Sequence, residues 1–365
     1  MSRNSVEEPR TEEQYIALTY NGHRRLAVLA ILTALLFLVI GVAVSIGSTH
    51  IPLSTTWQVL LSKLPLIDIS SGIDEGTDVI VTDIRLPRVI LAGIAGAALA
   101  VAGAAYQGLF RNPLADPFLM GVASGAGMGA VIAMAFTSGW FAWLATGVVP
   151  PFAFLGALAA VGIVYMVSRV GSKLPVTIMI LAGVVVAAFF SAISHYLMLA
   201  IEELAHLGLS FLWGAGLQTA NWREVVIALP LVGLGVIIVS LYGRNLNVMQ
   251  LDEEQAQQLG VDVESAKRVL IVAATIITAA AVSFAGVIGF VGIIVPHFVR
   301  LVWGPDYRYL VPISMLVGAI FLMVADMALR GLPGSEETPI GVFTALIGGP
   351  FFLYLLQKRK GEALF

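Results

Sequence analysis

The stretch VLIVAATIITAAAVSFAGVIGFVGIIVPHFV, residues 269–299, contains no charged residue over its 31 positions. A continuous helix of this length would measure about 46 Å at 1.5 Å per residue, whereas the hydrocarbon core of a bilayer is about 30 Å thick. Gly286, Gly289 and Gly292, with Pro296 beyond them, offer a place to bend or end a helix, because glycine tolerates unusual backbone angles and proline cannot continue the hydrogen-bond ladder. We predict two short helices here, divided at the glycines.

The whole chain has a composition suited to lipid as its solvent. Of its 365 residues 58% are hydrophobic and 12% charged, and the mean hydropathy is +0.92, whereas soluble proteins carry roughly 25% charged residues. Eight further apolar segments are each long enough for one span, and Asp326 is the one charged residue among them. We therefore predict an all-α polytopic membrane protein with ten transmembrane helices, eight of them over 26–46, 89–109, 118–137, 148–167, 176–199, 225–242, 309–329 and 339–357.

Lysine and arginine are distributed unevenly between the two faces that ten spans would create. The outer face would receive only Lys63, Arg85, Arg88, Arg223 and Arg330. Because cytoplasmic loops carry the excess of basic residues, this distribution predicts that both termini are cytoplasmic. A single span at 269–299 would instead place Lys358, Arg359 and Lys360 outside. The inner face would receive Arg3, Arg10, Arg24, Arg25, Arg111, Arg169, Lys173, Arg244, Lys267, Arg268, Arg300, Arg308, Lys358, Arg359 and Lys360.

These boundaries define the expected organisation of the chain. We expect a cytoplasmic N-terminal tail over 1–24, a ten-helix domain over 25–357 and a cytoplasmic C-terminal tail over 358–365, in the cell (inner, cytoplasmic) membrane. The glycines at 93, 96 and 103 and at 121, 125 and 129 are spaced for close helix contact, since small residues let backbones approach each other in lipid.

One inner and two outer connections, 243–268, 47–88 and 200–224, are too long to be simple turns. In the inner connection Asp252 to Gln258 favours a short helix, which Gly260 would end because glycine is the usual residue just past a helix C-terminus. Such a surface helix can dock a cytoplasmic partner, and it can equally be a solvated part of a loop.

The sequence carries no clear catalytic motif. It has no Gly-x-x-x-x-Gly-Lys-[Ser/Thr] phosphate loop and no cysteine, and a net charge of −3 does not indicate nucleic-acid binding. Two other classes stay open. An intramembrane hydrolase would need Ser124 as its nucleophile and His195 or His297 as the partner of that serine. A self-powered secondary transporter would need Asp326 as an acidic group at membrane depth, although Arg330 four residues later can neutralise its charge.

Seven sequence blocks stand out along the chain: Ile84-Arg-Leu-Pro-Arg88, Gly108-Leu-Phe-Arg-Asn-Pro-Leu-Ala-Asp-Pro117, Leu181-Ala-Gly-Val184, Leu246-Asn-Val-Met-Gln-Leu251, Leu259-Gly260, Gly286-Val-Ile-Gly-Phe-Val-Gly-Ile-Ile-Val-Pro-His297 and Pro339-Ile-Gly-Val-Phe-Thr-Ala-Leu-Ile-Gly-Gly-Pro350. Several of them are ten or more residues long. In their sequence and order, from about residue 24 to 357, they resemble the FecCD family, the permeases of iron-siderophore, haem and vitamin B12 ABC importers (type II importers).

The resemblance implies a type II ABC importer permease fold in a homodimer or paired permease. Two separate ATPase subunits would bind ATP and Mg on the inside, and a periplasmic or extracellular substrate-binding protein would dock on the outside. This chain would need no cofactor or metal of its own and would catalyse no reaction. An iron-siderophore is the commonest cargo of the family, with vitamin B12 and haem next.

The resemblance also assigns roles to particular positions. Arginines on the outer rim would meet acidic residues of the binding protein, and they match Arg85, Arg88 and Arg330. The cytoplasmic gate matches Asn112 and Leu114 after the second span and Val176 and Thr177 at the start of the fifth. The coupling helices over 243–268 would contact the ATPase through Asp252, Glu253, Glu254, Gln255, Gln258, Leu259 and Gly260.

Overall fold

The computed structural model describes residues 12–47, 49–63, 73–137, 145–332 and 338–362, and these residues form helices and no strand. The longer helices are α1 (Glu12–Ser45), α4 (Leu86–Leu109), α5 (Val122–Thr137), α6 (Ala145–Ser168), α7 (Val176–Ala200), α9 (Trp222–Leu241), α12 (Val263–Ala285), α13 (Val291–Trp303), α14 (Tyr307–Arg330) and α15 (Ile340–Glu362). Short helices lie in the connections: α2 (Leu53–Ser62), α3 (Glu75–Val79), η1 (Ile80–Arg85), η2 (Pro117–Met120), α8 (Glu202–Leu212), η4 (Ala215–Thr219), α10 (Gly243–Val248) and α11 (Glu253–Gln258).

The apolar stretch at 269–299 divides where the glycines predicted it would. Helix α12 ends at Ala285 and α13 begins at Val291. Between them Gly286 has a φ of 79° and Phe290 a φ of 70°, both in the left-handed region that a continuing helix does not use. The backbone N–H of Val287 donates to the Phe211 carbonyl at 3.2 Å, so the break is packed against the end of α8. The prediction of two helices is confirmed.

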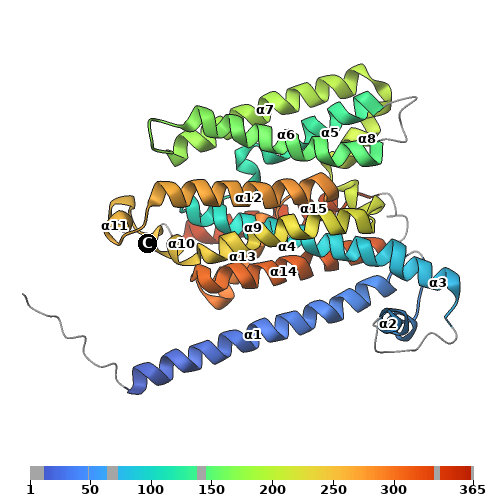
Figure 1. Cartoon of the computed structure of the whole chain (residues 1–365), viewed down its shortest axis with the longest axis horizontal. Coiled ribbons are helices and arrows are strands. Elements are labelled where there is room, and N and C mark those ends of the chain that lie inside the picture. The colour runs from blue at the N-terminus through green and yellow to red at the C-terminus, as the bar shows by residue number, and fades with distance from the viewer. Residues whose placement is uncertain (1–11, 48, 64–72, 138–144, 333–337, 363–365) are drawn as a thin grey trace, which may run out of the picture.

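Seven helical segments of the described chain are long and apolar enough to cross a bilayer. Three further apolar helices are shorter, over Val122–Thr137, Val291–Trp303 and Ile340–Leu353. Figure 1 shows α5, α6, α7 and α8 grouped on one side of the bundle, with α12, α9, α4, α13 and α14 beside them and α1 along the far edge. Helices α10 and α11 lie at one end of the bundle and α2 and α3 at the other, and α1 begins at the α11 end (Figure 1).

Helix α4 is the central element of the bundle. Nearly every side chain from Leu91 to Leu109 is buried, and the helix packs on α14, α12, α13 and α9. Gly96 faces the Gly318 carbonyl and Gly103 faces the Gly292 carbonyl so closely that a Cβ at either position would overlap backbone. Gly125 likewise faces Gly156. These glycines therefore have the close-packing role that their spacing predicted.

Gly121 has a different role from the one that its spacing predicted. It has a φ of 77° and separates η2 from α5, so the expected helix over 118–137 begins only at Val122. The ends of the chain also differ from expectation. Helix α1 begins at Glu12, within the expected tail over 1–24, and α15 continues to Glu362. Residues 1–11 and 363–365 of the expected tails lie outside the described residues.

The expected outer loop over 47–88 is largely helical. Helices α3, η1 and α4 form one continuous helical run from Glu75 to Leu109, and η1 within it is a π-helix. Arg85 and Arg88 are consequently held on a rigid element and not on a loop, and π-helical turns of this kind are frequent at functional sites. Residues 64–72 of the loop lie outside the described residues.

Candidate functional site

The inner connection contains the short helix that the sequence predicted. Asp252 has extended backbone angles and precedes α11, and Gly260 follows the helix with a φ of 85°. The N–H of Gly260 bonds to the Gln257 carbonyl and that of Val261 to the Ala256 carbonyl, which is the Schellman arrangement of a glycine-terminated helix. Beneath it a small apolar cluster fixes the helix against the bundle; its members are Met249, Ala256, Val263 and Ala266.

Helix α11 presents most of its predicted contact residues on one exposed surface. Asp252, Glu254, Gln255, Gln258, Leu259 and Gly260 are exposed, and Glu253 is half-buried. Leu259 is 64% exposed although it is apolar, and Leu251, which the sequence did not single out, is 44% exposed. Exposed leucines within a ring of acidic and amide groups are suited to a partner that covers the apolar groups and pairs with the carboxylates.

A buried lysine connects α11 to the start of α7. The Lys267 ammonium, 2% exposed, lies 2.9 Å from Glu253 Oε1 on α11 and 2.9 Å from Glu264 Oε1 on its own helix α12. It also donates to the Leu174 carbonyl at 3.3 Å, and the Leu174 N–H donates to Glu264 Oε2 at 2.9 Å. Leu174 lies two residues before α7, at whose start Val176 and Thr177 stand. We name Lys267, Glu253, Glu264 and Leu174 the inner ionic cluster.

The turn after α4 is also tied to this connection. Arg111, in a left-handed conformation at φ 50°, donates to the Leu251 carbonyl at 3.2 Å and lies 3.4 Å from Asp252 Oδ1. Asn112 Oδ1 accepts from the Leu114 N–H at 3.0 Å, which holds the turn closed. Sequence reasoning overlooked both Arg111 and Lys267. Arg111 contacts a segment 140 residues away, and the Leu174 carbonyl that Lys267 binds is 93 residues away, although its partner Glu264 is only three residues away.

The residues predicted to form the gate occupy two separate places. Asn112 and Leu114 precede η2, which packs on the middle of α7 where Gly183 faces the Leu119 carbonyl. Val176 is half-buried and Thr177 exposed at the beginning of α7. No hydrogen bond joins the two pairs in the described part of the chain. Nearby, burial raises the pKa of Asp116 to about 6, while its carboxylate accepts the Phe118 N–H at 2.8 Å.

The three predicted outer arginines all bind groups of their own chain. Arg85 is 6% exposed and donates to the carbonyls of Val44, Ser45 and Thr49 at the end of α1. Arg88 donates to Asp326 Oδ1 from Nε at 3.0 Å and from a terminal nitrogen at 2.8 Å. Arg330 Nε donates to Asp326 Oδ2 at 2.8 Å, so the neutralising pair that the sequence predicted is present. We name Arg85, Arg88, Arg330 and Asp326 the outer arginine cluster.

The geometry of this cluster differs from that of an exposed rim. The side chains of Arg88 and Arg330 are only 18% and 10% exposed, and Asp326 is fully buried. The difference arises because α4 is extended by η1 and α3, and the end of α1 covers Arg85. Docking of a partner by these arginines stays a prediction.

Two of the residues named for a hydrolase, Ser124 and His195, are engaged elsewhere. Ser124 Oγ donates to the Gly121 carbonyl at 2.9 Å, and His195 Nδ1 lies 2.7 Å from the Ser191 carbonyl oxygen. Both are ordinary contacts within a helix or at its start, and each side chain binds a backbone carbonyl of its own helical segment. The geometry offers no support for a serine nucleophile there.

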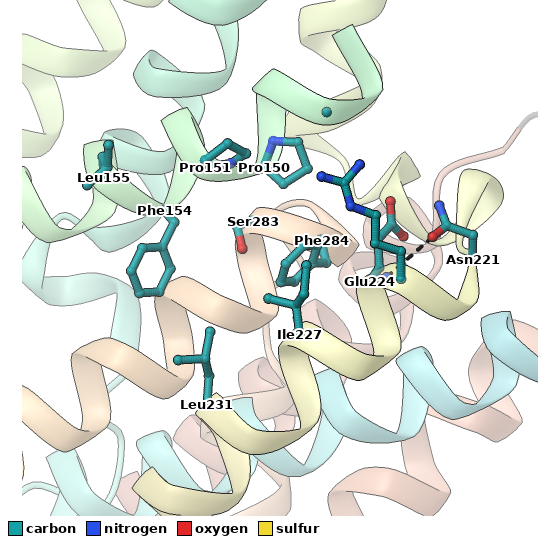
Figure 2. A pocket seen from close by; sticks show the side chains of 12 residues that line it. Pro150, Pro151, Phe154, Leu155, Asn221, Glu224, Ile227, Leu231, Ser283 and Phe284 are labelled. Atoms are coloured by element: carbon teal, nitrogen blue, oxygen red, sulfur yellow. Dashed lines mark hydrogen bonds between the residues drawn. The ribbon is translucent and has the colours of Figure 1, made fainter. Parts of the chain in front are cut away.

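An apolar cavity of about 450 Å³ lies between α6, α9 and α12. Figure 2 shows Phe154 of α6 and Leu231 of α9 pointing toward each other, with Ser283 and Phe284 of α12 to the right of Phe154 in the view. Asn221 and Glu224 stand at one end of the cavity (Figure 2). No sequence pattern predicted this cavity, because its lining comes from three separate segments.

Taken together, the apolar helical bundle and the surface helix at one end of it are typical of a multi-pass membrane protein. The model of the FecCD transport family matches residues 31–358, and the chain belongs to this family. The family was correctly inferred from the sequence blocks.

Several characterised permeases are similar over most of their length. The chain is 42% identical over 293 residues to the cobalamin import system permease protein BtuC of Halobacterium salinarum, covering 80% of this chain and 77% of that protein. It is 36% identical over 356 residues to the iron(3+)-hydroxamate import system permease protein FhuB of Bacillus subtilis, covering 96% and 87%. It is 38% identical over 283 residues to the hemin transport system permease protein HmuU of Yersinia pestis, covering 77% and 84%.

The fold is similar to that of a solved transporter. An inward-facing conformation of a metal-chelate type ABC transporter superposes with a TM-score of 0.76 at 29% identity, covering 92% of this chain and 99% of that one. The relatives are transporter permeases, and this chain is accordingly a membrane permease of the same family.

Proposed function

We propose that the chain is the membrane-spanning subunit of an ATP-driven importer that takes up a metal chelate. Two separate ATPase subunits would bind ATP and Mg at the α11 end, and a substrate-binding protein would dock at the opposite end. The names of the relatives support the cargo class, since they include cobalamin, iron(3+)-hydroxamate and hemin importers. We keep an iron-siderophore as the first candidate, with vitamin B12 and haem next.

The exposed surface of α11 carries this proposal, because it is built to engage a partner and is linked internally to α7. ATP-driven closure of the ATPase pair would move α11, and the inner ionic cluster would pass that movement to the start of α7. Val176 and Thr177 there, with Asn112 and Leu114 after α4, would open the inner end of a path between two permease copies. This is alternating access by helix displacement at a subunit interface.

Charge reversal on α11 tests the partner assignment. Glu254 is exposed and forms no ion pair within the described residues, so Glu254→Lys should leave the fold intact. We expect at least a tenfold loss of the ATPase that co-purifies with the tagged permease. Glu75→Lys, an equally exposed reversal at the other end of the bundle, should have no effect. Full retention of the ATPase by Glu254→Lys would reject the α11 contact, and uptake that is insensitive to ATP depletion would favour a secondary transporter.

We also propose ten membrane spans with both termini cytoplasmic, counting the seven long helices and the three shorter ones. The chain has no cysteine, so single cysteines can report the side of the membrane directly. In intact cells a membrane-impermeant maleimide should label Glu75→Cys, and it should label Ser172→Cys and Pro305→Cys only after permeabilisation. All three positions are exposed. Labelling of Pro305→Cys from outside would mean that α12 and α13 together cross once, which would overturn the ten-span topology.

A further inference from the structure

The cavity between α6, α9 and α12 combines an apolar interior with a polar end. Its walls include Pro150, Phe154, Ile227, Leu231 and Phe284, and its volume of about 450 Å³ lies within the range of small-molecule pockets. Leu155 and Ile227, which also line it, are 60% and 41% exposed on the outer surface of their helices. In a membrane protein, exposed apolar side chains of this kind face hydrocarbon. The cavity is therefore reachable by lipid.

The polar end of the cavity contains a carboxylate oxygen without a partner. Glu224 Oε2 is buried and accepts no hydrogen bond from the described residues. The backbone N–H of Glu224 is already bound to Asn221 Oδ1 at 3.3 Å, as the dashed line in Figure 2 marks. Buried polar atoms nearly always have a partner, and a buried carboxylate is costly without one. The missing partner is best supplied by a cationic N–H donor from outside the chain.

An arginine adjoins this carboxylate. Arg223 also lines the cavity and forms no ion pair within the described residues. A Cβ added at Gly147, at the start of α6, would lie 3.9 Å from its guanidinium, so this group is positioned over the cavity end. Guanidinium groups bind phosphate well. Trp222, the residue before Arg223, is 39% exposed, and its indole N–H donates to the Thr82 carbonyl at 2.9 Å. Tryptophan is typical of the head-group level of a bilayer, so this end of the cavity is expected to lie at that level.

We propose that this cavity binds one phospholipid with a primary-amine head group, such as phosphatidylethanolamine. The ammonium would donate to Glu224, the phosphate would pair with Arg223, and one acyl chain would enter between Phe154 and Leu231. The complementary order of charges favours this ligand over a lipid whose head group has no ammonium, such as phosphatidylglycerol, which would leave Glu224 unpaired. The inference requires only that these helices cross a bilayer, so it is independent of the cargo and of the ATPase assignment.

Head-group selectivity tests the proposal. The full-length chain would be reconstituted in nanodiscs with equal amounts of phosphatidylethanolamine and phosphatidylcholine, released into detergent, and its retained lipid measured by native mass spectrometry. We expect at least tenfold enrichment of phosphatidylethanolamine, because the choline head group has no N–H donor. Glu224→Gln should bring the two lipids near parity. Asp83→Asn, at an exposed carboxylate near the same end, should keep the enrichment.

A second variant tests the cavity itself. Ile227→Trp should fill the space and reduce the retained lipid of either type several-fold, with little change in folding because residue 227 is partly exposed. Equal retention of the two lipids by the wild-type chain would overturn the proposal, as it would show a non-selective annular lipid or a cavity covered by a second copy of the chain. Unchanged enrichment in Glu224→Gln would overturn it as well.

Discussion

Lys267→Met should reduce ATP-coupled uptake at least tenfold while the assembled complex continues to hydrolyse ATP. The ammonium of Lys267 is the group that α11, α12 and the residues before α7 all share. Methionine has a similar length and fills the same space, but it cannot hold Glu253 or the Leu174 carbonyl. Movement of α11 would then no longer reach the start of α7. Removing one partner of a buried ion pair typically destabilises a protein by about 3–5 kcal/mol. We therefore expect the contact between α11 and the start of α7 to be lost and not merely weakened.

A neighbouring residue provides the matched control for this prediction. Arg268 follows Lys267 on the same helix but is exposed and forms no ion pair within the described residues. Arg268→Met removes the same charge from the same end of α12 and should leave uptake near the wild-type level. Uptake and ATPase activity would be measured on the same proteoliposomes, with protein content normalised. Wild-type uptake by Lys267→Met would show that the inner ionic cluster does not carry the movement.

Glu253→Gln separates coupling from folding if Lys267→Met assembles poorly. Glu253 is half-buried, and Glu253→Gln removes the charge attraction between α11 and Lys267 while leaving an amide oxygen that can accept one hydrogen bond. The Glu264–Lys267 pair and the Leu174 contacts stay in place. We expect normal assembly with several-fold lower uptake per ATP hydrolysed. The double variant Glu253→Gln/Lys267→Met should take up no less substrate per ATP than Lys267→Met alone. The reason is that the Glu253–Lys267 contact is already absent in Lys267→Met.

Some of this organisation could be predicted from local sequence, because local physics decides it. The division at 286–290 followed from an apolar stretch longer than a bilayer, and the end of α11 followed from Gly260. Gly96 and Gly103 were correctly predicted as packing positions. Gly121 has the same spacing as Gly125 but sits at a φ of 77°, and spacing alone cannot distinguish a packing glycine from a turn glycine.

The ion pairs could be predicted only where both partners lie within one helical turn. Asp326 and Arg330 are four residues apart, so their pair was visible in the sequence. Arg88 is 238 residues from Asp326, and Lys267 is 93 residues from Leu174, so these contacts depend on how the helices pack. The same limit explains why Arg85 was expected on an outer loop. Its burial follows from the end of α1 lying over it.

The second large effect is expected at Asp326. This fully buried carboxylate accepts hydrogen bonds from both Arg88 and Arg330, so Asp326→Asn would leave two poorly exposed guanidinium groups without an anion. We expect a loss of about 3–5 kcal/mol in the free energy of unfolding, seen as a much lower melting temperature in detergent. Asp78→Asn is the matched control. It breaks the ion pair with Lys63, in which the Lys63 side chain is 53% exposed and the Asp78 side chain 32% exposed. Because the pair is exposed to solvent, its loss should lower the free energy of unfolding by less than about 1 kcal/mol.

The same substitution distinguishes a structural cluster from a docking site. Three arginines and one carboxylate leave the outer arginine cluster with an excess of two positive charges, which Asp326→Asn raises to three. If the cluster attracts an acidic binding protein, the folded fraction of Asp326→Asn should associate faster than the wild-type chain at low salt, since such charges mainly change association rates. Arg88→Gln/Asp326→Asn restores the original excess and should recover both part of the stability and the wild-type association rate. An association rate that is the same in all of these variants would mean that Arg88, Arg330 and Asp326 hold α4, α14 and the end of α1 together and do nothing more.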